Sequence, residues 1–213
     1  FVTTMKDSGY PVSVSISPSG ELVCVSYLFV DSGQMKSSVA FYNFGDVGKN
    51  NTNNYVSGYD YSNSVVPYTR FLDNGSAFAV SDDRVMFFSG GQKPVSAAEN
   101  LVSENVQSVY YGSEYVGLVF NSTQGGSKYR LDVYHKSGKM EQSVEFDIEY
   151  SDILFHDDQI IIYNESECCV YNTNGTEKYS GNFDKAVLVL IPQSSPYRYM
   201  VVTPDSVDTI ELK

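Results

Sequence analysis

The sequence predicts an all-β protein, a β-propeller built from four-stranded antiparallel blades. Three observations support this fold class. Val outnumbers Leu and Ala together, and Tyr occurs 18 times, a composition typical of strands and not of helices. Short runs of alternating apolar and polar residues end in turns rich in Gly, Pro and Asp. The same succession of strands and turns recurs about every 40 residues, the size of a propeller blade.

The first repeat shows the pattern that the others follow. Strands are expected at Pro11–Ser17, at Glu21–Val30, in a run that ends in VAFYNFG (39–45), and at Asn54–Tyr61. The turns between them, Pro18-Ser19-Gly20 and Asp31-Ser32-Gly33, contain the residues that tight turns favour. We expect one propeller domain or fragment over 1–213, with repeats at about 11–61, 67–102, 106–146, 150–183 and 186–213.

The later repeats have strands of the same length and order. In the second they are expected at 68–72, 76–80, 84–89 and 95–102, and in the third at 106–111, 115–121, 129–135 and 140–146. In the fourth they are expected at 150–155, 159–164, 167–172 and 177–183, and in the fifth at 186–192, 197–203 and 206–213.

The third strands give the register of the repeats. They read VAFYNFG, RVMFFSGG, LDVYHKSG and CCVYNTNG, with marker aromatics at Tyr42, Phe88, Tyr134 and Tyr171. The markers are 46, 46 and 37 residues apart, and Ile210 stands at this place in the last repeat. A β-sandwich with regular strand spacing is the alternative fold, but it does not account for matched third strands.

The number of strands leaves two ways to complete the ring. The fifth repeat stops after its third strand, and Phe1–Met5 (FVTTM) has the composition of a single strand. In a closed ring of five blades, Phe1–Met5 pairs with Ser206–Lys213. In an open arc of a larger propeller, it is the last strand of a preceding blade. Open blade edges are prone to pair with other chains, so self-association is an expected property of the open arc.

Charge narrows the range of partners. The chain carries 14 Lys and Arg against 26 Asp and Glu, a formal net charge of −12. Nucleic acids and anionic membrane surfaces attract clustered Lys and Arg, so neither is expected as a partner. No apolar run reaches the length needed to span a membrane. The chain begins with Phe1, so we expect an upstream segment, where any anchor or export signal would lie.

Several stretches resemble one family over essentially the whole chain. They are DSGYPVSVSISPSGELVCVSYLFVDSGQMKSSVAFYNFGDVG (7–48), VSGYDYSNSVVP (56–67), DDRVMFFSG (82–90), YVGLVFNS (115–122), KYRLDVY (128–134), IIIYNESECCVYN (160–172) and VTPDSVDTIELK (202–213). The family is one of uncharacterised, membrane-anchored, propeller-like proteins of Gram-positive bacteria. The resemblance implies an extracytoplasmic propeller that follows one transmembrane helix, with two or three blades upstream of this chain. The SPSG turn (17–20) is also similar to WD-type and quinone-type propellers, but their tryptophans are absent.

Residues that commonly carry catalysis are few. Cys24, Cys168, Cys169, His135 and His156 are all the cysteines and histidines, and they form neither zinc spacing nor a nucleophile triad. The acidic doublets Asp82-Asp83 and Asp157-Asp158 are interpreted as equivalent turns between second and third strands, and the DNG turn (73–75) as hairpin chemistry in place of a calcium site. We expect no catalytic residue, no metal and no cofactor.

Two groups remain as candidates for a binding surface. Tyr55, Tyr59 and Tyr61 lie near an Asn-rich stretch and offer large contact area with few rotatable bonds. Asp152 lies in a first strand, YSDILF, which lines the axis in propellers and would direct a carboxylate toward a channel. The sequence therefore predicts a non-catalytic propeller that binds a protein, a peptide or a cell-wall glycan. The alternative is a carbohydrate-active hydrolase, which needs two or three carboxylates converging in one pocket.

Overall fold

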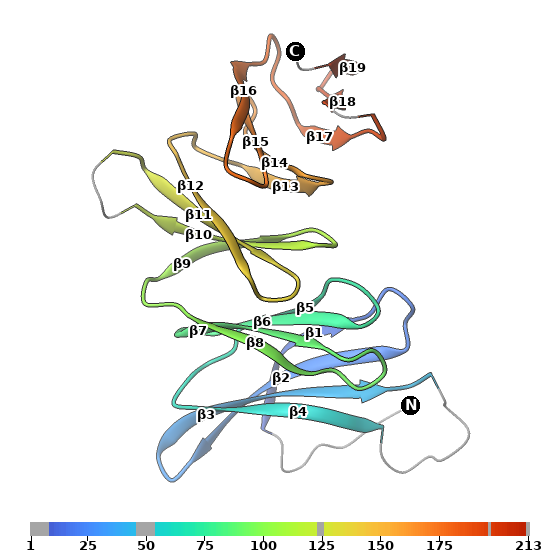
Figure 1. The fold of residues 1–213 in the computed structure, drawn as a ribbon, viewed down its shortest axis with the longest axis vertical. Coiled ribbons are helices and arrows are strands. Elements are labelled where there is room, and N and C mark those ends of the chain that lie inside the picture. The colour runs from blue at the N-terminus through green and yellow to red at the C-terminus, as the bar shows by residue number, and fades with distance from the viewer. Residues whose placement is uncertain (1–8, 46–53, 123–125, 196, 212–213) are drawn as a thin grey trace. The chain divides into compact units, whose positions relative to one another are not determined.

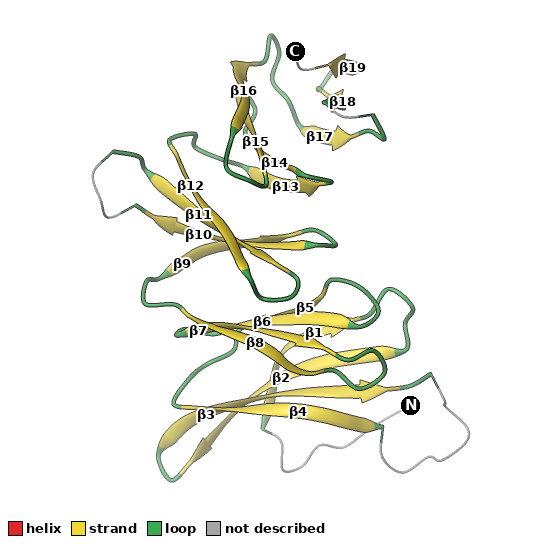
Figure 2. Ribbon diagram, in the orientation of Figure 1, coloured by secondary structure: helices red, strands yellow, loops and turns green. Residues whose placement is uncertain are grey.

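The computed structural model describes residues 9–45, 54–122, 126–195 and 197–211. The regular elements in these ranges are all strands (Figures 1 and 2), and none of these ranges contains a helix long and apolar enough to cross a membrane. The strands form five sheets, four with four strands and one with three. The chain divides into two compact units, Phe1–Val106 with Tyr134–Lys139 and Gln107–Val133 with Met140–Lys213.

The first unit contains two sheets whose strands follow one another in chain order. Sheet 1 consists of β1 (Tyr10–Ile16), β2 (Leu22–Asp31), β3 (Gln34–Asn43) and β4 (Tyr55–Ser62). Sheet 2 consists of β5 (Tyr68–Phe71), β6 (Ser76–Val80), β7 (Arg84–Ser89) and β8 (Val95–Leu101). Neighbouring strands in both sheets run antiparallel, as tight turns between successive strands require.

The second unit contains the other three sheets, apart from the first residue of β9 and the last two residues of β11. Sheet 3 consists of β9 (Val106–Tyr111), β10 (Tyr115–Asn121), β11 (Tyr129–His135) and β12 (Met140–Phe146). Sheet 4 consists of β13 (Asp152–His156), β14 (Gln159–Tyr163), β15 (Glu167–Asn172) and β16 (Glu177–Asn182). Sheet 5 consists of β17 (Val189–Pro192), β18 (Arg198–Val202) and β19 (Val207–Glu211).

The predicted all-β architecture of repeated four-stranded sheets is confirmed, with strand boundaries that shift by only a few residues. One detail of the predicted turns is wrong. Asp82-Asp83 lies between second and third strands, but Asp157-Asp158 lies between the first and second strands, β13 and β14. The two doublets are therefore not equivalent. The expected strand Phe1–Met5 lies outside the described residues.

Each unit buries apolar side chains between the facing surfaces of successive sheets. In the first unit, Phe41 of sheet 1 is fully buried, with ring centroids 6.0 Å from Phe71 and 5.0 Å from Phe88 of sheet 2. In the second unit, one cluster joins sheets 3 and 4, and another joins sheets 4 and 5. The strand QIIIY of β14 is buried on both faces because its isoleucines contribute to both clusters.

A β-bulge recurs where the third strand meets the fourth, at the aromatic residue that marks the repeat. The pairing register shifts between Phe41 and Tyr42, between Phe87 and Phe88, and between Val170 and Tyr171. Each bulge opposes two residues of the fourth strand to one of the third, which reverses the face that the fourth-strand side chains point to. The matched third strands of the sequence therefore mark a repeated backbone irregularity.

The first strands of sheets 1 and 2 lie side by side without forming a common sheet. Instead, serine side chains of β1 hydrogen-bond to β5. Ser13 Oγ accepts from the backbone N–H of Thr69 at 3.1 Å, and Ser15 Oγ accepts from that of Phe71 at 3.0 Å. The alternation of PVSVSIS consequently buries the serine at Ser15 and exposes its apolar neighbours, Val14 at 51% and Ile16 at 61%.

Candidate functional site

The structure does not bring the three candidate tyrosines together on one surface. The bulge in β3–β4 pairs Tyr55 with Tyr42 on one face of sheet 1, where Tyr55 is 48% exposed. Tyr59 and Tyr61 lie on the opposite face and pack against the core of the first unit, with their rings 5.0 Å apart. Tyr61 is 2% exposed, its hydroxyl has no hydrogen-bond partner among the described residues, and burial raises its pKa.

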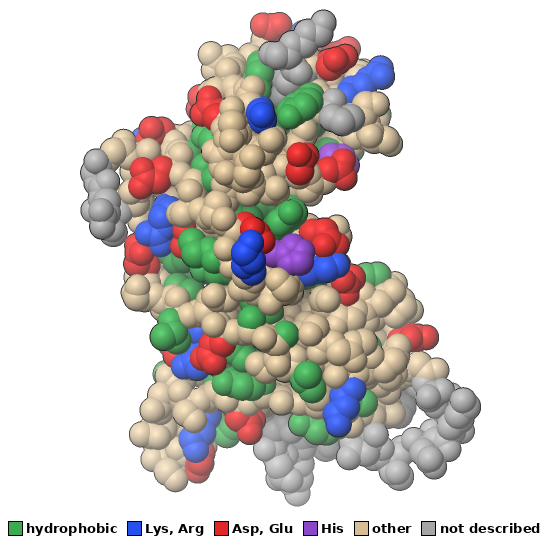
Figure 3. Space-filling view, in the orientation of Figure 1, with side chains coloured by type: hydrophobic (Ala, Val, Ile, Leu, Met, Phe, Trp, Pro, Cys, Tyr) green, Lys and Arg blue, Asp and Glu red, His purple; other side chains and the backbone are tan. Residues whose placement is uncertain are grey.

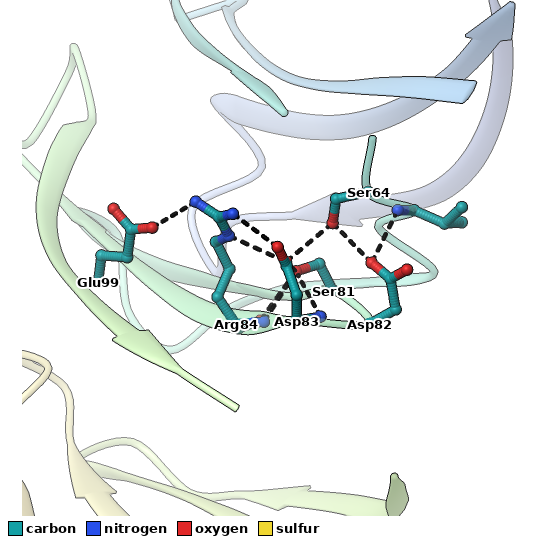
Figure 4. Close-up of polar contacts among 7 residues, drawn as sticks. Ser64, Ser81, Asp82, Asp83, Arg84 and Glu99 are labelled. Atoms are coloured by element: carbon teal, nitrogen blue, oxygen red, sulfur yellow. Dashed lines mark hydrogen bonds and ion pairs between the residues drawn. The ribbon is translucent and has the colours of Figure 1, made fainter. Parts of the chain in front are cut away.

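The doublet Asp82-Asp83 forms the centre of a polar network in the first unit (Figure 4). Asp82 Oδ1 accepts from Ser64 Oγ at 2.6 Å and from the backbone N–H of Val65 at 3.0 Å. Arg84 donates to Asp83 twice, from Nε at 2.9 Å and from Nη2 at 2.6 Å, and its Nη1 pairs with Glu99. This network ties the connection between β4 and β5 to the β6–β7 turn, so both carboxylates are already occupied.

The charges of this network stabilise one another. The hydrogen bonds from Arg84 hold the pKa of Asp83 well below its usual range, and the bonds to Asp83 raise the pKa of Arg84. A carboxylate with a depressed pKa is a poor general base or acid near neutral pH. The doublet therefore has a structural role: it holds the β4–β5 connection against the β6–β7 turn. This agrees with its interpretation from sequence as a turn and not as a catalytic pair.

Asp83→Asn should lower the free energy of unfolding by about 1 kcal/mol at pH 7, a modest value because the Asp83 side chain is 42% exposed. The depressed folded pKa means that this stabilisation is present above the unfolded value of about 3.9 and is lost as the pH falls through the folded value. Urea unfolding between pH 7 and pH 2.5 checks this. Asp157→Asn, in an exposed turn, is the control, and equal acid sensitivity in wild type and Asp83→Asn would contradict this structural role.

Asp152 lies at the start of β13, in the second unit, in a cluster of hydroxyl groups. Its Oδ1 accepts from the backbone N–H of Ile153 at 2.8 Å, and its Oδ2 accepts from the hydroxyl of its cross-strand partner Tyr163 at 3.4 Å. Burial raises the pKa of Tyr163, and the negative charge of Asp152 adds to this effect. Asp152 itself is half-buried.

Residues of sheet 3 complete this group. The hydroxyls of Ser108 and Tyr150 share a hydrogen bond of 2.8 Å, and the ring of Tyr110 packs edge-on against Tyr150 at 6.0 Å. Burial raises the pKa of Tyr110, and the Asp152 charge contributes to that rise. We name Ser108, Tyr110, Tyr150, Asp152 and Tyr163 the first-strand cluster, since β9 and β13 supply most of it.

The first-strand cluster offers one carboxylate, several phenol hydroxyls and aromatic ring surface. Such a set can accept hydrogen bonds from a ligand, hold an ammonium or guanidinium group, and stack against a flat or apolar surface. The contacts described for Asp152 are a backbone N–H and a tyrosine hydroxyl, with no second carboxylate. The first-strand cluster, as defined, therefore contains one carboxylate, whereas glycoside hydrolysis uses two.

A pocket of about 170 Å³ lies in the second unit, between the loop that follows β16 and sheet 5. Its lining contains four apolar residues and four polar ones, three of which are charged. The apolar residues are Phe183, Val187, Val201 and Ile210, and the polar ones are Asp184, Lys185, Thr203 and Asp208. Sequence reasoning did not find this site, because its lining combines strands of sheet 5 with the loop that joins sheet 4 to sheet 5.

The cysteines and histidines have structural environments. Burial raises the pKa of Cys24 and of Cys168 to about 12, and it also raises that of Cys169, so these thiols stay protonated and unreactive at neutral pH. His135 Nδ1 hydrogen-bonds to Ser137 within the β11–β12 turn, and His156 Nε2 lies 3.0 Å from the carbonyl oxygen of Gln193. Neither histidine contact involves a cysteine.

The DNG turn has the geometry of hairpin chemistry. Asp73 Oδ1 accepts from the backbone N–H groups of Gly75 at 2.7 Å and Ser76 at 2.6 Å, and its Oδ2 accepts from Lys136 Nζ at 3.3 Å. Within the described ranges, no group of three or more His, Cys, Asp or Glu is arranged to hold a metal ion. On the face shown in Figure 3, acidic and basic side chains are interspersed within each unit.

Solved structures similar to this chain identify the fold. The β-propeller domain of the trilobed protease from Pyrococcus furiosus, described as having an open velcro topology, matches with a TM-score of 0.55 and 13% identity over 97% of this chain and 72% of that one. The acylaminoacyl peptidase of Pyrococcus horikoshii matches with 0.55 and 12% over 90% of this chain and 35% of that one. A eukaryotic initiation factor matches with 0.57 and 10% over 91% and 48%. At these identities the likeness shows the fold alone, a β-propeller.

Sequence comparisons identify a family but no relative of known function. No curated protein matches the chain. One family model, described as a family of unknown function, matches residues 1–212.

Proposed function

The chain belongs to a family of unknown function, DUF5711, and we propose that it is a non-catalytic binding propeller that acts outside the cytoplasm. In this proposal a helix upstream of these residues holds it at the membrane, and its ligand is a protein, a peptide or a cell-wall glycan. The β-propeller fold and the acidic composition are compatible with this role. Propellers present loops and first strands to ligands without requiring catalytic groups.

The observation that carries the proposal is the first-strand cluster. A half-buried carboxylate lies among tyrosine hydroxyls and rings, which suits recognition of ammonium and hydroxyl groups. Lysine-containing peptides and amino sugars of cell-wall glycans both offer such groups. Since the cluster holds a single carboxylate, binding is favoured over hydrolysis.

Titration of the ¹⁵N-labelled chain with soluble peptidoglycan fragments, and separately with a lysine-containing peptide, tests this function by NMR. We expect the backbone amides of Tyr110 and Asp152 to shift with one of the two ligands. Asp152→Asn should weaken that binding about tenfold, the loss expected for one charge-assisted hydrogen bond. Asp158→Asn, which makes the same change in an exposed turn, is the control. Shifts elsewhere only, or equal binding by both variants, would contradict the proposal.

Carbohydrate hydrolysis is the second candidate, and one observation favours it. Asp184 and Asp208 line the same pocket, and glycoside hydrolysis uses two carboxylates in one pocket. The volume of about 170 Å³ is below the 300–1,000 Å³ typical of ligand pockets, and Lys185 lies beside the two acids. Release of nitrophenol from chromogenic glycosides, abolished by Asp208→Asn, would establish hydrolysis in place of binding.

A further inference from the structure

Among the described residues, the last strand, β19, has one edge without a partner strand, which we call the free edge. Sheet 5 has the order β17-β18-β19, and no strand among the described residues pairs with β19 on the side away from β18. The four other sheets have a fourth strand at this place. The free edge presents a row of main-chain N–H and C=O groups, whose alternation matches another extended strand and little else.

The pocket of about 170 Å³ lies beside this free edge. Asp208 and Ile210 of β19 line it, together with Val201 of β18, on the face of sheet 5 that packs toward sheet 4. Cavities of about 150 Å³ lined by apolar residues hold a benzene-sized group. The pocket is therefore large enough for one side chain of a strand added to β19, and too small for a sugar chain.

The charge around β19 favours a basic partner. Asp205 lies in the turn before the strand, Asp208 and Glu211 lie on it, and Asp184 joins Asp208 at the pocket. Arg198 of β18 stands opposite Glu211, so the acids that a basic peptide would meet are Asp184, Asp205 and Asp208. Lys185 is the single basic residue of the pocket lining. A strand with Lys or Arg on either side of one apolar residue would complement these acids.

We propose that β19 binds an extended peptide strand with basic flanks, which pairs with the free edge and inserts one apolar side chain into the pocket. This is β-strand addition, in which main-chain hydrogen bonds give affinity and a side-chain pocket gives specificity. The site differs from the first-strand cluster in residues, sheet edge and mode of recognition, so it stands or falls independently of the function proposed above.

Amide hydrogen exchange of the chain with and without the capped peptide Lys-Thr-Val-Phe-Val-Thr-Lys tests this proposal. We expect the peptide to slow exchange in β19 and to leave β9 and β13 unchanged, because only strand pairing protects edge amides. A peptide of the same sequence with N-methyl groups on alternate residues should give no protection, because it lacks the main-chain donors. Equal protection by both peptides would overturn strand addition.

Two variants separate the pocket from general charge. Asp208→Lys should weaken peptide binding about tenfold or more, because it replaces electrostatic attraction of the basic peptide by repulsion at the pocket. Asp205→Lys makes the same charge change in the exposed turn outside the pocket lining and should have a much smaller effect. If both variants weakened peptide binding equally, binding would depend on the net charge of the protein alone, and the proposed role of the pocket would be wrong. The β19 amides could also be protected without peptide, to a degree that rises with protein concentration. That result would show that a second copy of the chain pairs with the free edge, and it would contradict the proposal of a peptide partner.

Discussion

Phe41→Ala should destabilise the first unit by about 3–5 kcal/mol, the largest loss expected of any single truncation in that unit. Phe41 is fully buried and makes edge-on ring contacts with Phe71 and Phe88 across the two sheets. Removing its ring leaves a cavity between sheets that cannot collapse without moving both. Amide hydrogen exchange resolved by residue measures this loss in β2, β3 and β7.

Leu101→Ala is the matched control for this prediction. Leu101 lies on β8 of the same unit and is 78% exposed, so its truncation should change stability by no more than about 0.5 kcal/mol. If the Phe41 and Leu101 variants lost stability equally, the cluster around Phe41 would not be the core that holds the sheets together.

Tyr199→Ala should destabilise sheet 5 by about 3–5 kcal/mol. Tyr199 is 1% exposed and belongs to the cluster that joins sheets 4 and 5. Its hydroxyl donates to Gln159 Oε1 at 2.7 Å, and Gln159 is itself 3% exposed. The ring therefore packs between the sheets while the hydroxyl satisfies a buried amide of β14.

Two further variants divide this effect. Tyr199→Phe keeps the ring but leaves the amide oxygen of Gln159 without its donor, which should cost about 1–3 kcal/mol. Val207→Ala, at a residue of β19 that is 62% exposed, should be nearly neutral. Hydrogen exchange of β17–β19 gives all three values. A Phe variant as damaging as the Ala variant would show that the hydroxyl, and not the ring, holds sheet 5.

The strands were predictable from sequence because their signals are local. Alternation and turn residues place β6, β7 and β9–β12 at the predicted residues, since both signals lie within a few positions of each strand end. The marker aromatics also gave the correct repeat register. What the alternation could not show is the bulge beside Tyr42, Phe88 and Tyr171, because a bulge depends on how two strands pair and not on either strand alone.

The same inability to predict strand pairing and sheet packing explains where the candidate binding residues were placed incorrectly. Tyr55, Tyr59 and Tyr61 share one parity in the sequence, and an unbroken strand would place them on one face. The bulge at Tyr42 moves Tyr55 to the other face. Asp152 was predictable as a first-strand acid. Its neighbours from β9 and the pocket beside β19 were not, because they depend on packing between sheets.

The serines of β1 have a consequence for how sheets can be gained or lost as such a protein evolves. Because Ser13 and Ser15 meet the N–H groups of β5 with side chains, the ladder of main-chain bonds stops at each sheet. Two sheets joined by a continuous ladder would fuse into one eight-stranded sheet with a single curvature. The hydroxyl seam keeps sheets 1 and 2 as separate modules. A whole module can then be duplicated or deleted without breaking a hydrogen-bond ladder inside its neighbours.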